Sequence, residues 1–309
     1  MKTIAPSIFA LTCFSAFFCH SIYAEENASI LELDKAKVEN ADSILDEQDD
    51  STKKALKNPF SLSQHKQNYF LPLSYASNPN SKNVPGLTSE NVDNLEAKYQ
   101  ISVKLPLYVP SNDTTGLYFA FTAKSFWQVY NSDVSKPFRE TNYEPEAFYA
   151  WQNELSILGF KFNQIQLGIN HQSNGRSDQL SRSWNRIFGS VVFSDADSFY
   201  YLKAWYRIPE DPKTGPDDAS GDDNPDITTY MGLAELGYGT SFGDINLLGT
   251  LRNNLRTSDN KGSIELNLTY PLTDNYDLLL QYFNGYGDSL IDYNRHQQRV
   301  SLGIQLKYF

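Results

Sequence analysis

Apolar and polar residues alternate along most of this chain, and this pattern limits the chain to a fold built of β-strands. Near the C-terminus, apolar residues occupy every second position of one segment: Val300, Leu302, Ile304, Leu306 and Tyr308. After residue 24, no run approaches the ~18–20 consecutive apolar residues that a membrane-spanning helix needs. The sequence therefore predicts an all-β protein whose strands are apolar on one face.

Twelve segments carry this alternation, and the links between them alternate between short and long. The predicted strands are 67–76, 97–109, 116–130, 145–156, 160–173, 183–195, 199–208, 227–239, 243–253, 262–270, 275–284 and 298–309. Bacterial outer-membrane barrels have an even number of antiparallel strands, short periplasmic turns and long outer loops. We therefore predict a twelve-stranded antiparallel transmembrane β-barrel of the bacterial outer membrane over residues 67–309.

The first 24 residues have the features of a secretory signal peptide. Lys2 supplies a basic start, residues 8–18 are apolar, and Ala24 offers a small residue at the expected cleavage point. Both cysteines of the chain, Cys13 and Cys19, lie within this segment. Cleavage would therefore leave a mature chain without thiols, and so without disulfides or thiolate metal sites.

The chain is acidic, which excludes one large class of partners. It contains 26 Lys and Arg residues and 37 Asp and Glu residues, so its formal net charge is −11. Nucleic-acid binding usually requires a basic surface, so we expect no nucleic-acid partner. Residues 25–66 are polar and acidic, and we expect them to form a disordered or weakly helical segment before the barrel.

One predicted strand carries polar residues on its apolar face, near the end that enters a long outer loop. In the segment 160–173, His171 and Ser173 continue the face that begins with Ile165, Leu167 and Ile169. This face is expected to contact lipid. Polar groups are costly there, so both residues are candidates for function.

Asn185 lies on the next predicted strand, 183–195, and a hairpin would bring it close to His171. A serine, a histidine and a third, orienting residue are the components of an activated hydroxyl nucleophile. We therefore predict that Ser173 is the nucleophile, that His171 is its base, and that Asn185 orients the imidazole. The alternative is that His171 and Ser173 are aromatic-girdle or loop-edge residues with no catalytic role.

The loop that follows Ser173 contains candidate ligands for an oxyanion and for a cation. The amide of Gly175 lies next to the predicted nucleophile and is a candidate oxyanion donor. The Asp178 carboxylate and the Ser177 and Ser181 hydroxyls are hard oxygen ligands that suit Ca²⁺. The alternative is a solvated polar turn.

Two other motifs do not occur in the context that their chemistry requires. A G-x-S-x-G pattern at 239–243 falls at a predicted strand-to-strand turn, whereas a nucleophile elbow needs a strand followed by a helix. The acidic stretch 217–226 lacks the ligand spacing of an EF-hand. We interpret these segments as a turn and a solvated outer loop, and we assign no role to His65 or His296.

Four blocks of the sequence closely resemble the outer membrane phospholipase A family of bacteria. The blocks are 137–145, 170–178 continuing through 181–186, 222–228 and 286–294, and the similarity spans roughly residues 97–309. The resemblance implies a twelve-stranded barrel that hydrolyses acyl esters of phospholipids with calcium and as a homodimer. It carries over Ser173 as nucleophile, His171 as base, Asn185 as orienting residue and the Gly175 amide as oxyanion donor.

The same resemblance implies a set of calcium ligands. They are the side chain of Asp178, the hydroxyl of Ser181, the carbonyl of Arg176, Ser135 from the partner subunit, and Asp223 as a further acidic ligand of the unpaired form.

Three features depart from the family pattern. Residues 209–221 are longer than usual, and residues 25–66 have no clear counterpart. Ala123 stands where we would expect a polar residue in the barrel wall that helps the dimer associate. This last departure concerns the strength of the dimer and leaves the predicted triad intact.

These inferences combine into one hypothesis with two alternatives. We hypothesise calcium-dependent hydrolysis of phospholipids and lysophospholipids by a lipid-facing triad toward the outer leaflet, activated by reversible, calcium-linked dimerisation. The first alternative is a non-catalytic barrel, such as a porin or an adhesin. The second is an outer-membrane protease, which would need carboxylates near His171 facing water; the apolar neighbours of His171 argue against it.

Overall fold

The computed structural model describes residues 45, 50–54, 56, 62–81, 86–110, 114–195, 197–215 and 221–307. The expected signal peptide, residues 1–24, lies outside these residues. Within the expected N-terminal segment 25–66, residues 50–54 are helical and a short strand, β1 (Ser63–Gln64), pairs with the sheet. None of the described helices has the length and apolar character needed to cross a membrane.

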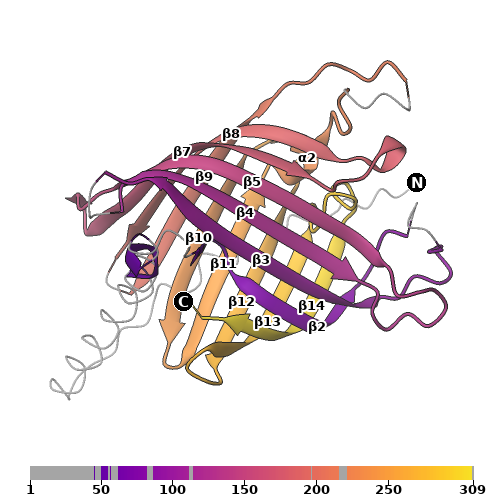
Figure 1. Ribbon diagram of the computed structural model, residues 1–309, viewed down its shortest axis with the longest axis horizontal. Coiled ribbons are helices and arrows are strands. Elements are labelled where there is room, and N and C mark those ends of the chain that lie inside the picture. The colour runs from indigo at the N-terminus through magenta and orange to yellow at the C-terminus, as the bar shows by residue number, and fades with distance from the viewer. Residues whose placement is uncertain are drawn as a thin grey trace, which may run out of the picture. The chain divides into compact units, whose positions relative to one another are not determined.

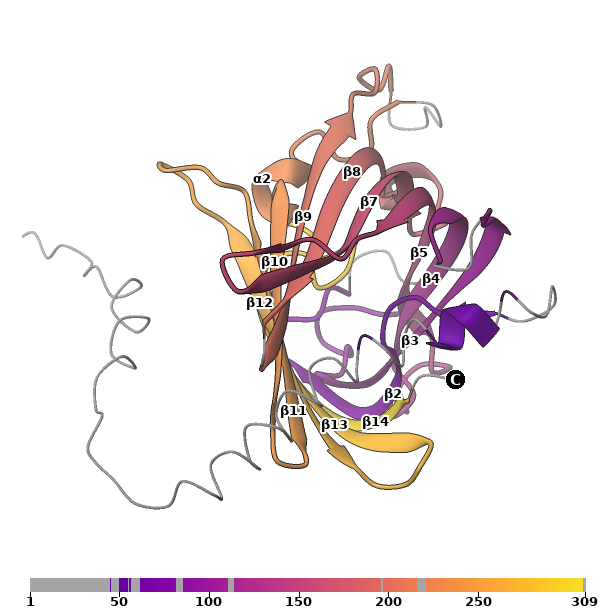
Figure 2. The same cartoon turned by 90° about the vertical axis from the view of Figure 1, so that its left-hand side faces the viewer.

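Twelve long strands of the described chain form one closed antiparallel sheet (Figures 1 and 2). They are β2 (Asn68–Ala76), β3 (Leu95–Tyr108), β4 (Gly116–Trp127), β5 (Phe138–Gln152), β7 (Phe160–Ser173), β8 (Ser183–Ser194), β9 (Ser198–Ile208), β10 (Ala234–Phe242), β11 (Ile245–Asn253), β12 (Gly262–Pro271), β13 (Tyr276–Gly285) and β14 (Gln297–Leu306). The pairing of β14 with β2 closes the ring, and a short strand, β6 (Ser156–Ile157), pairs with β7. The predicted barrel is confirmed.

The links between the strands keep the alternation that the sequence predicted. Links 195–197 and 243–244 are short, whereas 174–182 and 209–233 are long. The long links all lie at the same end of an antiparallel barrel, which corresponds to the outer end in bacterial barrels. The ends of β7 and β8 that carry the predicted triad lie at this end.

The two faces of the wall differ in chemistry as a membrane barrel requires. On β7, the exposed fractions of Ile165, Leu167 and Ile169 are 42%, 54% and 59%. The next residue, Asn170, is buried and donates a hydrogen bond to Glu144 at 2.8 Å. Exposed apolar groups at alternate positions form the surface that contacts lipid.

Part of the predicted strand 227–239 is wrong, because it begins as a helix. Helix α2 (Ile227–Met231) precedes β10, and its Ile227 and Met231 pack into an apolar cluster with Leu290 and Tyr293. Gly232 then ends the helix with φ 82°, and a Cβ there would lie 2.4 Å from the carbonyl oxygen of Asn253. Residues at i and i+4 share a helix face, so this packing overrides the β-propensity of the segment.

Strand β5 also begins earlier than predicted, at Phe138 instead of residue 145. The added residues are held by pairing with β4, where Asn142 lies opposite Lys124. Inside the barrel the side chain of Asn142 accepts a hydrogen bond from the Leu290 amide at 2.9 Å. The sequence predicted a loop for these polar residues, because their hydrogen-bond partners lie far away in the sequence.

A buried charge network fills the outer end of the lumen. Glu96 on β3 accepts hydrogen bonds from Arg139 and from Arg299, and all three side chains are fully buried. The loop 286–296 completes the network, because Asp292 pairs with Arg139 at 2.7 Å and Asp288 pairs with Arg299 at 2.7 Å. Burial disfavours ionised Asp288, but Arg299 and Lys98 hold the pKa of its carboxyl well below the usual range.

The remaining lumen holds a polar cavity of about 1060 Å³ that reaches this network. It is lined by charged side chains that pair across the barrel: Lys66 contacts Glu144 at 2.7 Å, and Lys203 contacts Glu146 at 3.1 Å. His65, to which the sequence assigned no role, bonds to Glu146 at 2.9 Å. Paired charged side chains therefore line the cavity, which reaches the network at the outer end through Asp288.

Candidate active site

His171 and Asn185 meet on the outer wall of the barrel. The register of β7 and β8 places the two residues directly opposite each other. Nδ1 of His171 and Oδ1 of Asn185 are 2.8 Å apart. The predicted approach of Asn185 to His171 is therefore present in the structure, and it results from the hairpin that joins the two strands.

Ser173 lies two positions after His171 and therefore on the same face of β7. It pairs with Ser183 on β8 and with Tyr143 on β5. Both His171 and Ser173 follow the exposed series that ends at Ile169, and both are partly buried. Among the described residues, no hydrogen bond joins Ser173 to His171. Such contacts are often long before substrate binds.

The hydrogen bond to Asn185 assigns a tautomer to His171. An amide oxygen only accepts hydrogen bonds, so Nδ1 of His171 must carry the hydrogen. In the neutral ring, the other nitrogen, Nε2, then carries a lone pair. A histidine in this state is suited to accept a proton from a neighbouring hydroxyl group.

The loop 174–182 is built around a buried residue that the sequence analysis did not single out. Oδ1 of Asn174 accepts hydrogen bonds from the amides of Arg176 and Arg182, at 3.3 and 2.9 Å. Its Nδ2 donates to the carbonyl of Leu180 at 2.9 Å. An asparagine at the start of a polar loop is the signal for such a turn. Gly175 follows with φ 63°, in the left-handed region, and is exposed beside the ring of Tyr143.

The structure brings two of the predicted calcium ligands together. Oγ of Ser181 donates to Oδ2 of Asp223 at 2.6 Å, across the gap between two outer loops. Ser183 donates to the same carboxylate oxygen at 3.2 Å. The donor set is therefore a carboxylate and hydroxyl groups, which are the hard oxygen ligands that Ca²⁺ prefers.

The other predicted calcium ligands make no such contact with Ser181 or Asp223 among the described interactions. Arg176 is held by its guanidinium, which donates to the carbonyl of Arg139 at 2.6 Å and lies 3.4 Å from Glu140. Ser135 is exposed in the link between β4 and β5. Asp178 lies in a short 3₁₀ turn (Asp178–Leu180), and its side chain is outside the described atoms. In the described part of the chain, no group of three or more His, Cys, Asp or Glu side chains is arranged to hold a metal ion.

Two side chains of the long loop after β9 contact predicted site residues, and the sequence analysis assigned neither a role. Glu210 accepts a hydrogen bond from Asn185 at 3.0 Å. Lys213 pairs with Asp223 at 2.6 Å. The far end of the loop is anchored by Tyr293, whose hydroxyl donates to Asp226 at 2.6 Å. Burial and this carboxylate raise the pKa of the Tyr293 hydroxyl, so the anchor persists at neutral pH.

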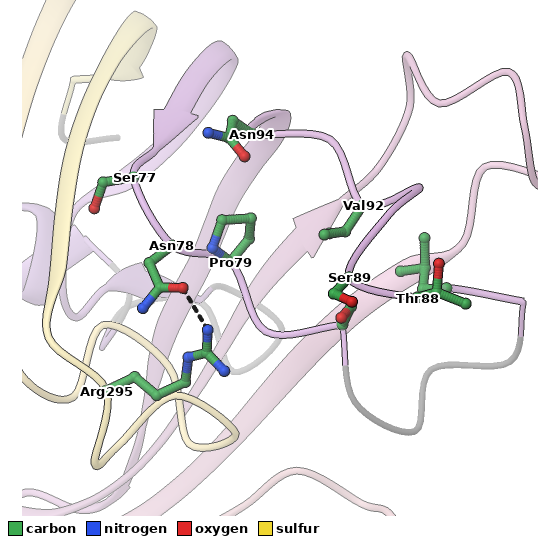
Figure 3. A pocket seen from close by; sticks show the side chains of 10 residues that line it. Ser77, Asn78, Pro79, Thr88, Ser89, Val92, Asn94 and Arg295 are labelled. Carbon is green, nitrogen blue, oxygen red and sulfur yellow. Dashed lines mark hydrogen bonds between the residues drawn. The ribbon is translucent and has the colours of Figure 1, made fainter.

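A second cavity of about 400 Å³ lies elsewhere at the outer rim, between the loop after β2 and Arg295 (Figure 3). Arg295 donates to the side chain of Asn78 across this cavity, at 2.5 Å. None of the predicted triad or calcium residues lines it.

Comparison with known proteins identifies the family. A family model described as phospholipase A1 matches residues 45–306. Phospholipase A1 of Escherichia coli K12 is 38% identical over 253 residues, which cover 81% of this chain and 82% of that protein. A putative phospholipase A1 of Neisseria meningitidis serogroup B is 32% identical over 270 residues, covering 82% of this chain and 68% of that protein.

Solved structures agree with this family in both fold and sequence. An active-site mutant of Escherichia coli outer membrane phospholipase A has a TM-score of 0.74 and 35% identity, covering 83% of this chain and 96% of that chain. The Salmonella typhi outer membrane phospholipase, solved as a dimer with bound calcium, has a TM-score of 0.72 and 38% identity, covering 81% and 93%. The chain therefore belongs to the phospholipase A1 family and is an outer-membrane β-barrel enzyme that hydrolyses phospholipids.

Proposed function

We propose that this protein hydrolyses acyl ester bonds of phospholipids and lysophospholipids through a triad of Ser173, His171 and Asn185. The observation that carries the proposal is the 2.8 Å contact between His171 and Asn185, on a lipid-facing wall and two positions from Ser173. Family membership supports phospholipid hydrolysis, and this contact supports His171 and Asn185 as parts of the proposed triad. A protease would need carboxylates near His171 that face water, whereas His171 continues the exposed apolar series of Ile165, Leu167 and Ile169 on β7.

The proposed reaction begins with proton transfer from the Ser173 hydroxyl to Nε2 of His171. The Ser173 oxygen then attacks the carbonyl carbon of the acyl ester, and His171 returns the proton to the departing alcohol. Water hydrolyses the resulting acyl-enzyme with His171 again acting as base. Asn185 holds the tautomer and the orientation of the imidazole throughout.

The Gly175 amide is the proposed protein donor to the oxyanion. It lies two residues after Ser173, in a turn whose φ of 63° favours glycine and which Asn174 holds in place. Preorganised donors of this kind stabilise charge that develops in the transition state. The exposed position of Gly175 leaves its amide accessible to an ester at the membrane surface.

Calcium is the proposed cofactor, and the loop residues fit it. Asp178, Ser181 and the Arg176 carbonyl would hold the ion, with Ser135 supplied by the partner subunit, and Asp223 would be a further acidic ligand in the unpaired form. The contact between Ser181 and Asp223 supports this set, as does the calcium bound to the Salmonella typhi relative. When bound, the ion would supply positive charge beside the developing oxyanion.

A reversible homodimer, linked to calcium binding, is the proposed active form. The outer wall beside Ser173 is apolar and includes Phe121, Tyr143 and Ile169. Ala123 lies in this wall, opposite Tyr143, which itself pairs with Ser173. Alanine offers no hydrogen bond to a partner at that position. We therefore expect the dimer to rely on apolar packing and on the shared calcium site, with the active site toward the outer leaflet.

Removal of calcium is expected to lower the rate of fatty-acid release on the order of 10²–10³-fold, the effect of losing one oxyanion-stabilising group. The mature chain would be refolded in detergent and assayed with a defined phospholipid, with calcium and with chelator. Ser173→Ala serves as the blank in both conditions. Equal rates with calcium and chelator would contradict the calcium proposal alone. No release under any condition would favour the non-catalytic barrel, which single-channel conductance would then test.

A further inference from the structure

We infer that Glu210 is a positioning residue, which fixes the amide of Asn185 so that its oxygen faces His171. This inference rests on the proposed triad and adds a fourth side chain behind it. Glu210 lies two residues after β9 ends at Ile208, and Ile208 pairs directly with Asn185 in the sheet. The partly buried contact from Nδ2 of Asn185 to Oε1 of Glu210 is 3.0 Å.

The orientation of the Asn185 amide depends on which of its neighbours donate and which accept hydrogen bonds. A free asparagine amide can turn by 180° and offer either its oxygen or its NH₂ group to a neighbour. An ionised carboxylate only accepts hydrogen bonds, so Glu210 attracts the NH₂ group of Asn185. The amide oxygen then has to face Nδ1 of His171, which must carry a hydrogen.

This chain of constraints determines the state of the catalytic base. With Nδ1 protonated, the lone pair is on Nε2, which is the nitrogen that the proposed reaction uses. Without Glu210, the amide can turn and present its NH₂ group to Nδ1, which favours the tautomer protonated at Nε2. That tautomer cannot accept the Ser173 proton. Glu210 also places a negative charge behind a neutral asparagine, where it favours the imidazolium formed during the reaction.

Two substitutions separate hydrogen bonding from charge. Glu210→Gln keeps the length of the side chain and one accepting oxygen, whereas Glu210→Met keeps the length and removes both oxygens. We expect kcat to fall on the order of 10-fold or more in Glu210→Met, as for other partners that orient a catalytic group, and to fall less in Glu210→Gln. KM should stay within about twofold, because Glu210 acts on the base and does not touch the lipid. Asp211→Asn is the matched control, since it removes one negative charge from the next residue.

A spectroscopic measurement tests the inference independently of activity. ¹⁵N-labelled histidine in the detergent-refolded mature chain reports which ring nitrogen carries the hydrogen, and His171→Ala identifies the signal. We expect the Nδ1-protonated form in the wild type and a shift toward the Nε2-protonated form in Glu210→Met. An unchanged tautomer in Glu210→Met would overturn the inference, even if kcat fell. A wild type no more active than Ser173→Ala would instead overturn the proposed function, while the tautomer would still decide the role of Glu210.

A different contact in the same loop supports a second inference, which also rests on the proposed calcium site. We infer that the ammonium group of Lys213 is a tethered cation that competes with calcium for Asp223. Its Nζ lies 2.6 Å from Oδ1 of Asp223, while Oδ2 of the same carboxylate accepts the hydrogen bonds of Ser181 and Ser183. The Asp223 side chain is 7% exposed and that of Lys213 is 21% exposed, so solvent screens this ion pair only in part.

Calcium affinity depends on how much uncompensated negative charge the ligands supply. With Lys213 in place, the charge of Asp223 is already neutralised, and an incoming cation must displace the ammonium group. We therefore expect Lys213→Gln to raise calcium affinity on the order of 10-fold. Lys261→Gln is the matched control, because Lys261 also pairs with an aspartate, Asp259, on an outer loop. Binding would be measured by titration calorimetry on the refolded, substrate-free protein.

The outcomes separate the two ideas. Tighter binding in Lys213→Gln but not in Lys261→Gln supports the inference, including the case in which only Lys213→Gln binds detectably. Equal affinity in the wild type and Lys213→Gln overturns the role of Lys213 and leaves the calcium site intact. Absence of binding in every variant overturns both the calcium site and the competition.

Discussion

Ser173→Ala and His171→Ala are each expected to lower kcat for phospholipid hydrolysis on the order of 10⁵–10⁶-fold, as loss of the nucleophile or base does in other serine hydrolases. Without the Ser173 oxygen no acyl-enzyme forms, and without His171 the hydroxyl keeps its proton. The double variant should lose no more than either single one, because the two residues act as a unit. Fatty-acid release from a defined phospholipid, at saturating calcium, gives these rates.

Asn185→Ala is expected to cost less, on the order of 10²–10⁴-fold, because Asn185 orients the base but does not react. Matched controls are available on the same barrel. Ser190→Ala removes a hydroxyl from β8 that contacts Gln166 in the lumen, and His296→Ala removes a ring that packs on Tyr286 in an outer loop. Both should retain full activity. Ser173→Ala with more than about one-tenth of the wild-type rate would exclude Ser173 as the nucleophile.

Glu96→Ala is expected to destabilise the barrel by about 3–5 kcal/mol, because it leaves two buried guanidinium groups without a shared partner. Arg139 donates to both oxygens of Glu96 at 2.9 Å, and Arg299 donates to one of them at 2.9 Å. All three side chains are fully buried, so bulk water does not solvate the two guanidinium groups. Unfolding by urea in lipid vesicles, followed by tryptophan fluorescence, measures the free energy of unfolding.

Glu90→Ala provides the comparison for this measurement, because Glu90 is an exposed carboxylate on the loop after β2. It should change the free energy of unfolding by no more than about 0.5 kcal/mol. Glu96→Gln should fall between the two, because it keeps one accepting oxygen and places an NH₂ group against a guanidinium. Equal stability of Glu96→Ala and Glu90→Ala would mean that the network at the outer end contributes little to folding.

The barrel could be predicted from the sequence because the alternation of apolar and polar residues is visible within each single strand. Residues such as Ile165, Leu167 and Ile169 alternate with polar neighbours, and the side chains of a strand point to opposite faces at a period of two. The same periodicity placed His171 and Ser173 on the outer wall. Strands β7 and β8 are consecutive in the sequence and pair directly, so even the approach of Asn185 to His171 followed from neighbouring strands.

Errors arose where contacts between distant residues decide the structure. The β-prone segment 227–231 forms a helix because Ile227 and Met231 pack against Leu290, far along the chain. The first residues of β5 join the sheet, and their polar side chains find partners in the loop 286–296. Neither effect leaves a local signal, since each depends on contacts with residues that are distant in the sequence.

The sequence by itself determined the strand pattern, the lipid-facing position of His171 and Ser173, and the chemistry that these residue types allow. Only the tertiary structure placed Glu210 behind Asn185 and Lys213 against Asp223, at 3.0 and 2.6 Å. It also gathered Glu96, Arg139 and Arg299 into one buried network. The physical reason is that alternation is a property of one strand. By contrast, the pairing of charged and polar side chains depends on how the closed sheet and its loops bring distant residues together.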